Sequence, residues 1–176
     1  NYLYNNILPH MLMYGPPGSG KTSTILACAK KLYGNESVFM TFELNASDDR
    51  GINVVRNVIR EFASTKHILK GYAIVVLDEA DSLTTEAQYA LRSIMDIYSQ
   101  NTILCLICNY ISKIIPPIIS RCTRFHFSKI IKTDMVSQIK YICNNENIKI
   151  KKDGINEVIN LSNGDFRKAI NIIQST

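Results

Sequence analysis

The sequence predicts an α/β fold, a parallel sheet covered by helices on both faces and followed by a small all-helical part. Short apolar runs alternate with helix-like segments over the first three-quarters of the chain, as expected for buried parallel strands. A glycine-rich loop follows the first apolar run. After about Ile130 the strand-like runs cease and only helix-like segments follow. We therefore expect one domain at residues 1–130 and a second at residues 131–176.

Length and composition fit this organisation. The chain has 176 residues, of which 46% are hydrophobic, enough for a sizeable core. No apolar run approaches the ~20 residues that span a bilayer, so we expect no membrane association. The net charge of +5 permits an anionic partner such as nucleic acid, although surplus lysine also favours solubility. The chain begins at Asn1 without a secretory leader, and we interpret it as a piece of a longer protein.

Five apolar runs are predicted to form the sheet. They are residues 10–14, 38–44, 72–77, 102–108 and 123–127. The first ends at the glycine-rich loop, and the third ends at the acidic pair Asp78-Glu79. Each acidic or glycine-rich segment therefore follows directly on a predicted strand.

Helical spacing of apolar residues predicts the remaining elements. Residues 22–33 place Ile25, Leu26, Ala29 and Leu32 on one stripe. Helices are also predicted at residues 52–63, 84–98, 133–145, 152–161 and 164–174, with a threonine cap at the start of 84–98. Pro116-Pro117 leaves room only for a short helix within residues 112–119.

The cysteines and histidines do not predict a metal site. Cys105 and Cys108 form a Cys-x-x-Cys pair, but they lie in a predicted strand, where side chains three apart point to opposite faces. No second pair has ligand spacing, and the three histidines are scattered. An odd total of five cysteines also argues against a disulfide framework. We interpret Cys105 and Cys108 as buried strand residues.

A phosphate-binding loop is the most specific motif. Residues 15–22 match G-x-x-x-x-G-K-[ST] at every fixed position, between a predicted strand and a predicted helix. Its backbone N–H groups and the helix N-terminus attract phosphate, Lys21 can reach the terminal phosphates, and the Thr22 hydroxyl can hold Mg²⁺. The predicted nucleotide-binding residues here are Gly15, Pro16, Pro17, Gly18, Ser19, Gly20, Lys21, Thr22 and Ser23.

The acidic pair supplies the second half of such a site. After a phosphate loop, the first acid, Asp78, would support Mg²⁺, and the next, Glu79, would polarise the attacking water. The alternative is a solvated helix cap. One complete strand–helix unit, residues 38–63, separates the two motifs along the chain. We expect this unit to place an additional strand between the phosphate-loop strand and the acidic strand.

Three further polar residues are candidates. Asn109 follows the predicted strand 102–108, which should lie beside the phosphate-loop strand, so its amide would face the terminal phosphate and orient water. Asparagine at a strand end is equally common as a turn residue. Arg121 and Arg167 have the charge to neutralise phosphate, but isolated arginines are usually surface residues.

Several segments together resemble the small subunits of replication factor C, the eukaryotic loader of the ring-shaped sliding clamp and a member of the AAA+ ATPases. They are residues 15–22, 43–51, 78–81 and 120–122. Residues 108–116 and 62–65 are most similar to the branch called subunit five in animals and subunit three in yeast. The resemblance implies an AAA+ P-loop NTPase fold, with a five-stranded parallel sheet flanked by helices and then a small helical lid.

The resemblance assigns roles. Lys21 and Thr22 would be the Walker A pair, Asp78 and Glu79 the Walker B pair, and Asn109 the first sensor. Arg121, in Ser-Arg-Cys, would be an arginine finger that acts in trans on the ATP site of the adjacent subunit. Arg167 would be the second sensor, on the lid. Asn45 resembles the polar residue that holds the Walker B glutamate idle until DNA arrives.

The resemblance also implies partners. ATP and Mg²⁺ would be the ligands, and four other replication factor C subunits, the sliding clamp and primer-template DNA the partners, in the nucleus, during replication and repair. Arg50 and Arg56 match positions that track the DNA backbone, without reading sequence. The family's adenine-binding segment before the loop and its C-terminal collar are missing, so we expect weak nucleotide binding and no pentamer assembly from these residues alone.

Other interpretations have less support. Asp78-Glu79-Ala80-Asp81 spells a helicase signature, but the remaining chain is too short for the second sheet domain that such helicases need. A nucleotide-binding structural subunit without turnover is a non-enzymatic alternative, and intact Lys21 and Glu79 argue against it. Another AAA+ DNA-remodelling ATPase is the remaining alternative.

Overall fold

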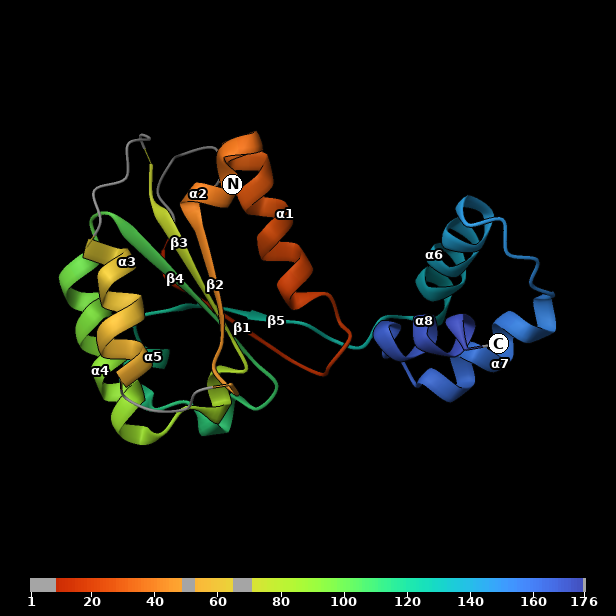
Figure 1. Ribbon diagram of the computed structural model, residues 1–176. Coiled ribbons are helices and arrows are strands. Elements are labelled where there is room, and N and C mark those ends of the chain that lie inside the picture. Colours follow the sequence, from red (N-terminus) through yellow and green to blue (C-terminus); the bar gives the residue numbers. More distant parts are fainter. Residues whose placement is uncertain (1–8, 49–52, 65–70, 176) are drawn as a thin grey trace. The chain divides into compact units, whose positions relative to one another are not determined.

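The computed structural model describes residues 9–48, 53–64 and 71–175. The chain divides into two compact units. The first comprises the chain up to Tyr14 together with Lys21–His126, and the second comprises Gly15–Gly20 together with the chain from Phe127 onward. The first unit contains the sheet and the second contains three helices (Figure 1).

A five-stranded parallel sheet, as predicted, forms the centre of the first unit. Its strand order is β2-β3-β4-β1-β5. The strands are β1 (Met11–Tyr14), β2 (Thr41–Asn45), β3 (Ala73–Asp78), β4 (Thr102–Cys108) and β5 (Thr123–His126). β4 is buried along its whole length, and β3 is buried up to its last residue. Apart from Thr102 and Asp78, both strands are apolar because side chains on both of their faces are covered.

The strand between the phosphate-loop strand and the acidic strand is not the one in residues 38–63. β4 lies between β1 and β3, whereas β2, which belongs to that unit, pairs only with β3 at the edge. One additional strand does lie between them, as predicted. It is β4, whereas the prediction assigned this place to the strand in residues 38–63. Spatial order follows from packing of the whole sheet, and order along the chain does not determine it.

Helices cover both faces of this sheet. α1 and α2 lie on one side, and α3 and α4 lie on the other (Figure 1). Their bounds are α1 (Lys21–Tyr33), α2 (Ser37–Met40), α3 (Arg60–Ser64), α4 (Thr85–Tyr98) and α5 (Pro116–Ile119). Shorter turns are η2 (Gly34–Glu36), η3 (Val54–Ile59, a π-helix), η4 (Ala80–Ser82) and η5 (Ile111–Lys113). Of the two threonines that could cap α4, Thr84 and Thr85, the structure shows that Thr84 does so.

Residues 38–40 were predicted as part of a strand but form most of α2. The register pairs Thr41 with Ile74, and β3 begins only one residue earlier, at Ala73. Residues 38 and 39 would therefore lack a ladder partner for their backbone groups, and a helical turn satisfies those groups instead. The Val38 and Phe39 side chains remain 79% and 74% exposed.

The second unit contains α6 (Lys132–Asn145), α7 (Lys152–Ser162) and α8 (Phe166–Gln174), the three helices predicted after the sheet. They share a small apolar core that includes Met135, Ile139, Ile159 and Ala169. Asn163, in the left-handed region with φ 51°, ends α7 before Gly164. Asparagine followed by glycine is a common way to end a helix, because both residues tolerate the left-handed region.

Cys105 and Cys108 are buried strand residues, as interpreted from the sequence, with 0% and 1% exposure. Burial raises the pKa of both thiols, that of Cys108 to about 12. Among the described residues no cluster of three His, Cys, Asp or Glu side chains is placed to hold a metal ion. No helix in these same segments combines the length and apolarity required to cross a membrane.

Candidate active site

Two hydrogen bonds join the start of α1 to the ends of β3 and β4. Lys21 Nζ donates to Asn109 Oδ1 at 3.1 Å, and Thr22 Oγ1 donates to Asp78 Oδ2 at 2.7 Å. Lys21 is only 7% exposed, unusual for a lysine. The structure thus brings together four of the predicted site residues from three separate parts of the sequence.

Sheet topology explains this meeting. β1, β4 and β3 are adjacent and parallel, so their carboxyl ends share one edge of the sheet. Asp78 is the last residue of β3, Asn109 follows β4, and the chain leaving β1 enters the glycine-rich loop. Crevices outside the carboxyl ends of parallel strands are the usual ligand sites of open α/β sheets.

Glu79 has an uncommon backbone conformation beside this cluster. Its φ is 52° and ψ 36°, the left-handed region, which for a non-glycine residue costs about 1–3 kcal/mol. Its N–H donates to Asp78 Oδ1 at 2.8 Å. Both carboxylate oxygens of Asp78 are thereby engaged, while the Glu79 side chain remains exposed to solvent.

Asn45 lies next to the acidic pair. It pairs with Asp78 in the β2–β3 register, and the following residue, Ala46, donates its N–H to Asp78 O at 2.9 Å. Asn45 Oδ1 accepts from both the N–H and the hydroxyl of Ser47, at 2.9 Å each. These bonds fix the turn after β2, so a role of Asn45 in restraining Glu79 stays a prediction.

The glycine-rich loop packs within the second unit. Gly18 O accepts from Phe166 N at 3.3 Å, and a Cβ at Gly18, where φ is 66°, would overlap the Asp165 carboxylate. At Gly20, with φ 89°, a Cβ would instead meet no atom within 4 Å. Gly18 is therefore required for close packing, whereas Gly20 leaves open space beside the backbone just before Lys21.

Arg167 lies in the first turn of α8, next to the residue that bonds Gly18, and its side chain is exposed. Asp165 caps this helix by accepting from Lys168 N at 3.1 Å. Arg167 is thus close along the chain to a residue that contacts the loop. Its assignment as a second sensor stays a prediction.

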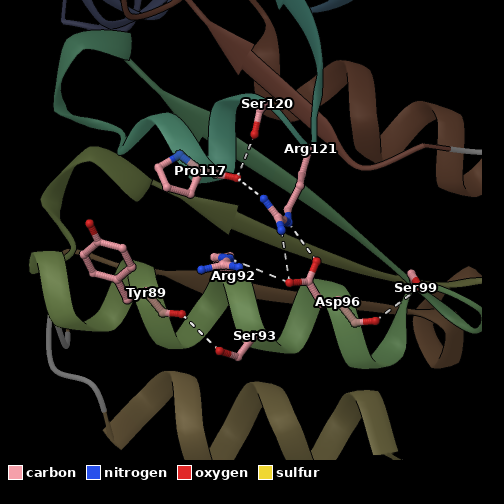
Figure 2. A network of polar contacts seen from close by, with 8 residues as sticks. All are labelled: Tyr89, Arg92, Ser93, Asp96, Ser99, Pro117, Ser120 and Arg121. Atoms are coloured by element: carbon pink, nitrogen blue, oxygen red, sulfur yellow. Dashed lines mark hydrogen bonds and ion pairs between the residues drawn. The ribbon is translucent and has the colours of Figure 1, made fainter.

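Arg121 lies elsewhere. Its Nε and Nη2 donate to the Asp96 carboxylate at 2.7 and 3.2 Å, and its Nη1 donates to Pro117 O at 2.9 Å (Figure 2). Arg121 precedes the first residue of β5, whereas Asp78 and Asn109 lie at the ends of their strands. The guanidinium is therefore held near the end of the sheet where the strands begin, away from the Lys21 cluster at their carboxyl ends. The role of Arg121 in trans stays a prediction.

The structure describes the backbone of only one of the two predicted DNA-contact residues. Arg50 lies outside the described residues, and Arg56 lies in η3 without a described side chain. The DNA role of both arginines remains a prediction from the resemblance.

Sequence reasoning missed the residues that hold the loop after Asn109. Gln88, 3% exposed, accepts from Ile115 N at 2.9 Å and donates to Lys113 O at 3.0 Å and Leu83 O at 3.3 Å. Asp81 Oδ2 accepts from Tyr110 N at 3.2 Å. A glutamine on the apolar stripe of residues 84–98 was a usable signal for Gln88. No sequence pattern pointed to Asp96.

Family models match two parts of the chain. Residues 11–130 match the ATPase family associated with various cellular activities (AAA). Residues 137–176 match the RCF1/5-like AAA+ ATPase lid domain. These matches confirm the prediction of an AAA+ sheet domain followed by a helical lid.

Curated relatives are similar over nearly the whole chain. Mouse replication factor C subunit 5 is 52% identical over 177 residues, covering 99% of this chain and 52% of the relative. Replication factor C small subunit 1 of Pyrobaculum aerophilum is 51% identical over 95% of this chain and 51% of its own length. Subunit 3 of Schizosaccharomyces pombe is 49% identical, covering 99% of this chain and 51% of the relative. The chain spans about half the length of these relatives.

Solved structures agree on the fold. The Thermotoga maritima RuvB Holliday junction branch migration motor superposes with a TM-score of 0.78, covering 98% of this chain and 56% of that one, at 18% identity. Such low identity supports the fold alone. The predicted resemblance is confirmed by the relatives, and the chain belongs to the ATPase family associated with various cellular activities, with about half of its residues identical to those of replication factor C small subunits.

Proposed function

We propose that this chain is the ATP-hydrolysing part of a subunit of a heteropentameric clamp loader. With four other replication factor C subunits, it would use ATP binding and hydrolysis to open the sliding clamp and load it on primer-template DNA, during replication and repair in the nucleus. The observation that carries the proposal is the pair of bonds Lys21–Asn109 and Thr22–Asp78 at the carboxyl edge of the sheet. The names of the relatives support the clamp-loader assignment.

The residues present fit ATP and Mg²⁺. The Thr22 hydroxyl and Asp78 carboxylate lie 2.7 Å apart and are the hard oxygen donors that Mg²⁺ prefers. These two residues would hold the ion, which when bound neutralises phosphate charge. A Cβ at Gly20 would meet no atom within 4 Å, so there is open space beside the loop on that side.

The protein groups would then divide the work. Lys21 would leave Asn109 to bind the terminal phosphates, and Asn109 would orient the attacking water. Glu79, exposed and adjacent to Asp78, would accept the proton of that water. Arg167 of the lid would contact the nucleotide of its own subunit. We also propose the domain division at residues 1–130 and 131–176.

Lys21→Ala tests the nucleotide site. We expect ATP affinity, measured by equilibrium titration, to fall at least about 100-fold, because charge-assisted bonds to phosphate contribute roughly 1.5–3 kcal/mol each. Lys30→Ala is the matched control, since Lys30 is an exposed lysine of the same helix. Equal affinities for the two variants would refute the phosphate-loop assignment. The clamp-loader assignment is tested separately, by copurifying the full-length protein with its four expected companions and assaying clamp loading.

Arg50→Ala with Arg56→Ala tests the proposed DNA contacts. Each lost phosphate contact should flatten the slope of log affinity against log salt by about 0.9 on duplex. Binding should weaken equally on different sequences, because phosphate contacts carry no sequence information. Affinity would be measured at several salt concentrations in the assembled complex. An unchanged slope would remove both arginines from the DNA interface.

A further inference from the structure

Arg121 is held by two acceptors from different elements. Figure 2 shows its guanidinium side-on to the Asp96 carboxylate of α4, with Oδ1 2.7 Å from Nε and Oδ2 3.2 Å from Nη2. Its Nη1 donates to Pro117 O of α5 at 2.9 Å. A bidentate pair with a second fixed acceptor sets both the position and the plane of the guanidinium.

Only part of the hydrogen-bonding capacity of Arg121 is used. An arginine carries five N–H groups, and three are engaged by Asp96 and Pro117. Within the described segments the other two, one on each terminal nitrogen, have no partner. The side chain is 31% exposed. The guanidinium is thus fixed by the fold while two of its N–H groups have no partner among the described residues.

The neighbouring residues fix the backbone at this point. The Ser120 hydroxyl donates to Pro117 O at 3.1 Å, and Cys122 packs against the apolar core of the sheet. The backbone on either side of Arg121 is anchored by these contacts. Rotation of the long Arg121 side chain is then the main remaining freedom, and Asp96 restricts it.

Stability alone is a poor explanation for this ion pair. Asp96 is 48% exposed, and ion pairs with such access to water contribute little to folding. Arg92, one helical turn before Asp96, lies 3.7 Å away from it, too far for a hydrogen bond. The hydrogen bonds from Arg121 lower the pKa of Asp96 and raise that of Arg121, as expected for two oppositely charged groups that stabilise each other.

We infer that Asp96 is a positioning residue for Arg121. It holds the guanidinium so that the two unused N–H groups can bind a phosphate of the nucleotide in an adjacent subunit. This inference rests on the proposed function, in which Arg121 acts in trans. It adds that the finger is aligned before the neighbour arrives, which lowers the entropy cost of ordering a long side chain at the interface.

The test compares Asp96→Ala, Asp96→Asn and Arg121→Ala in the assembled complex. All complexes also carry Glu79→Gln and the matching change in every other subunit except the one whose ATP site Arg121 is proposed to enter, so that turnover comes from that site alone. Arg121→Ala should lower this turnover by about 10³-fold. Asp96→Ala should lower it about tenfold through misplacement of the guanidinium, and Asp96→Asn, which keeps one acceptor oxygen, should fall between Asp96→Ala and the parent. Asp96→Ala should add nothing to Arg121→Ala.

Controls separate positioning from folding. Arg92→Ala removes the other ion-pair partner of Asp96 and should leave turnover unchanged. Thermal unfolding of each variant reports structural loss, and the milder Asp96→Asn serves if Asp96→Ala fails to fold. If Arg121→Ala lowers turnover but both Asp96 variants keep the parent value, the inference about Asp96 is wrong while the proposed role of Arg121 stands. Full turnover in Arg121→Ala would reject the trans role in the proposed function, and the inference with it.

Discussion

The two polar clusters of the sheet unit differ in how complete they are. At the carboxyl edge, Lys21 and Thr22 bond to Asn109 and Asp78, partners 88 and 56 residues away in sequence, in partly buried surroundings. Near the end where the strands begin, Arg121 bonds to the exposed Asp96 carboxylate, 25 residues away. Two of its N–H groups have no partner among the described residues. The first cluster assembles within one chain, whereas we propose that the second is completed by another molecule.

Helix α4 connects these clusters. Gln88, near its start, holds Lys113 O and Ile115 N of the loop that follows Asn109. Asp96, eight residues later and therefore about 12 Å along the axis, holds Arg121. One rigid helix thus supports both the loop that follows Asn109 and the proposed finger, Arg121. Variants that affect one cluster and spare the other test whether this division is real.

Glu79→Gln should give the largest difference between the clusters. Loss of a general base lowers turnover by about 10²–10⁴-fold, and here the loss should be confined to the chain's own site. ATP affinity should be retained, since Lys21, Thr22 and Asp78 are untouched. Single-turnover hydrolysis and equilibrium titration of ATP on the full-length protein would measure the two effects.

Glu86→Gln is the matched control for that change. Glu86 is an exposed glutamate in the first turn of α4, seven residues after Glu79, and should tolerate the same substitution without effect on turnover. Normal hydrolysis in Glu79→Gln would mean that another group accepts the proton. Loss of ATP affinity would mean that Glu79 supports binding instead of the chemical step.

Gln88→Met should have a smaller effect, on stability. Methionine fills the volume but leaves Ile115 N and Lys113 O without their side-chain partner, which should lower the free energy of unfolding by about 2 kcal/mol. Denaturant unfolding would measure the change against Glu86→Gln as a surface control on the same helix. An unchanged midpoint would show that α4 does not anchor the loop after Asn109.

Local chemistry was predictable wherever it depends on contiguous residues. The phosphate loop, the acidic pair and the Thr84 cap follow from short patterns, because backbone freedom at glycine and side-chain reach are local properties. The prediction failed at residues 38–40, where β-forming side chains have no strand partner to pair with. Strand propensity cannot replace a missing neighbour.

The sequence by itself determined where the phosphate-loop and acidic motifs lie and where most of the strands and helices form, since these depend largely on neighbours along the chain. Only the tertiary structure decided that β4 separates β1 from β3, that Lys21 meets Asn109, and that Arg121 meets Asp96. Each of these contacts joins distant segments. Their geometry depends on how all the elements pack around the shared core, and short sequence patterns do not specify that packing.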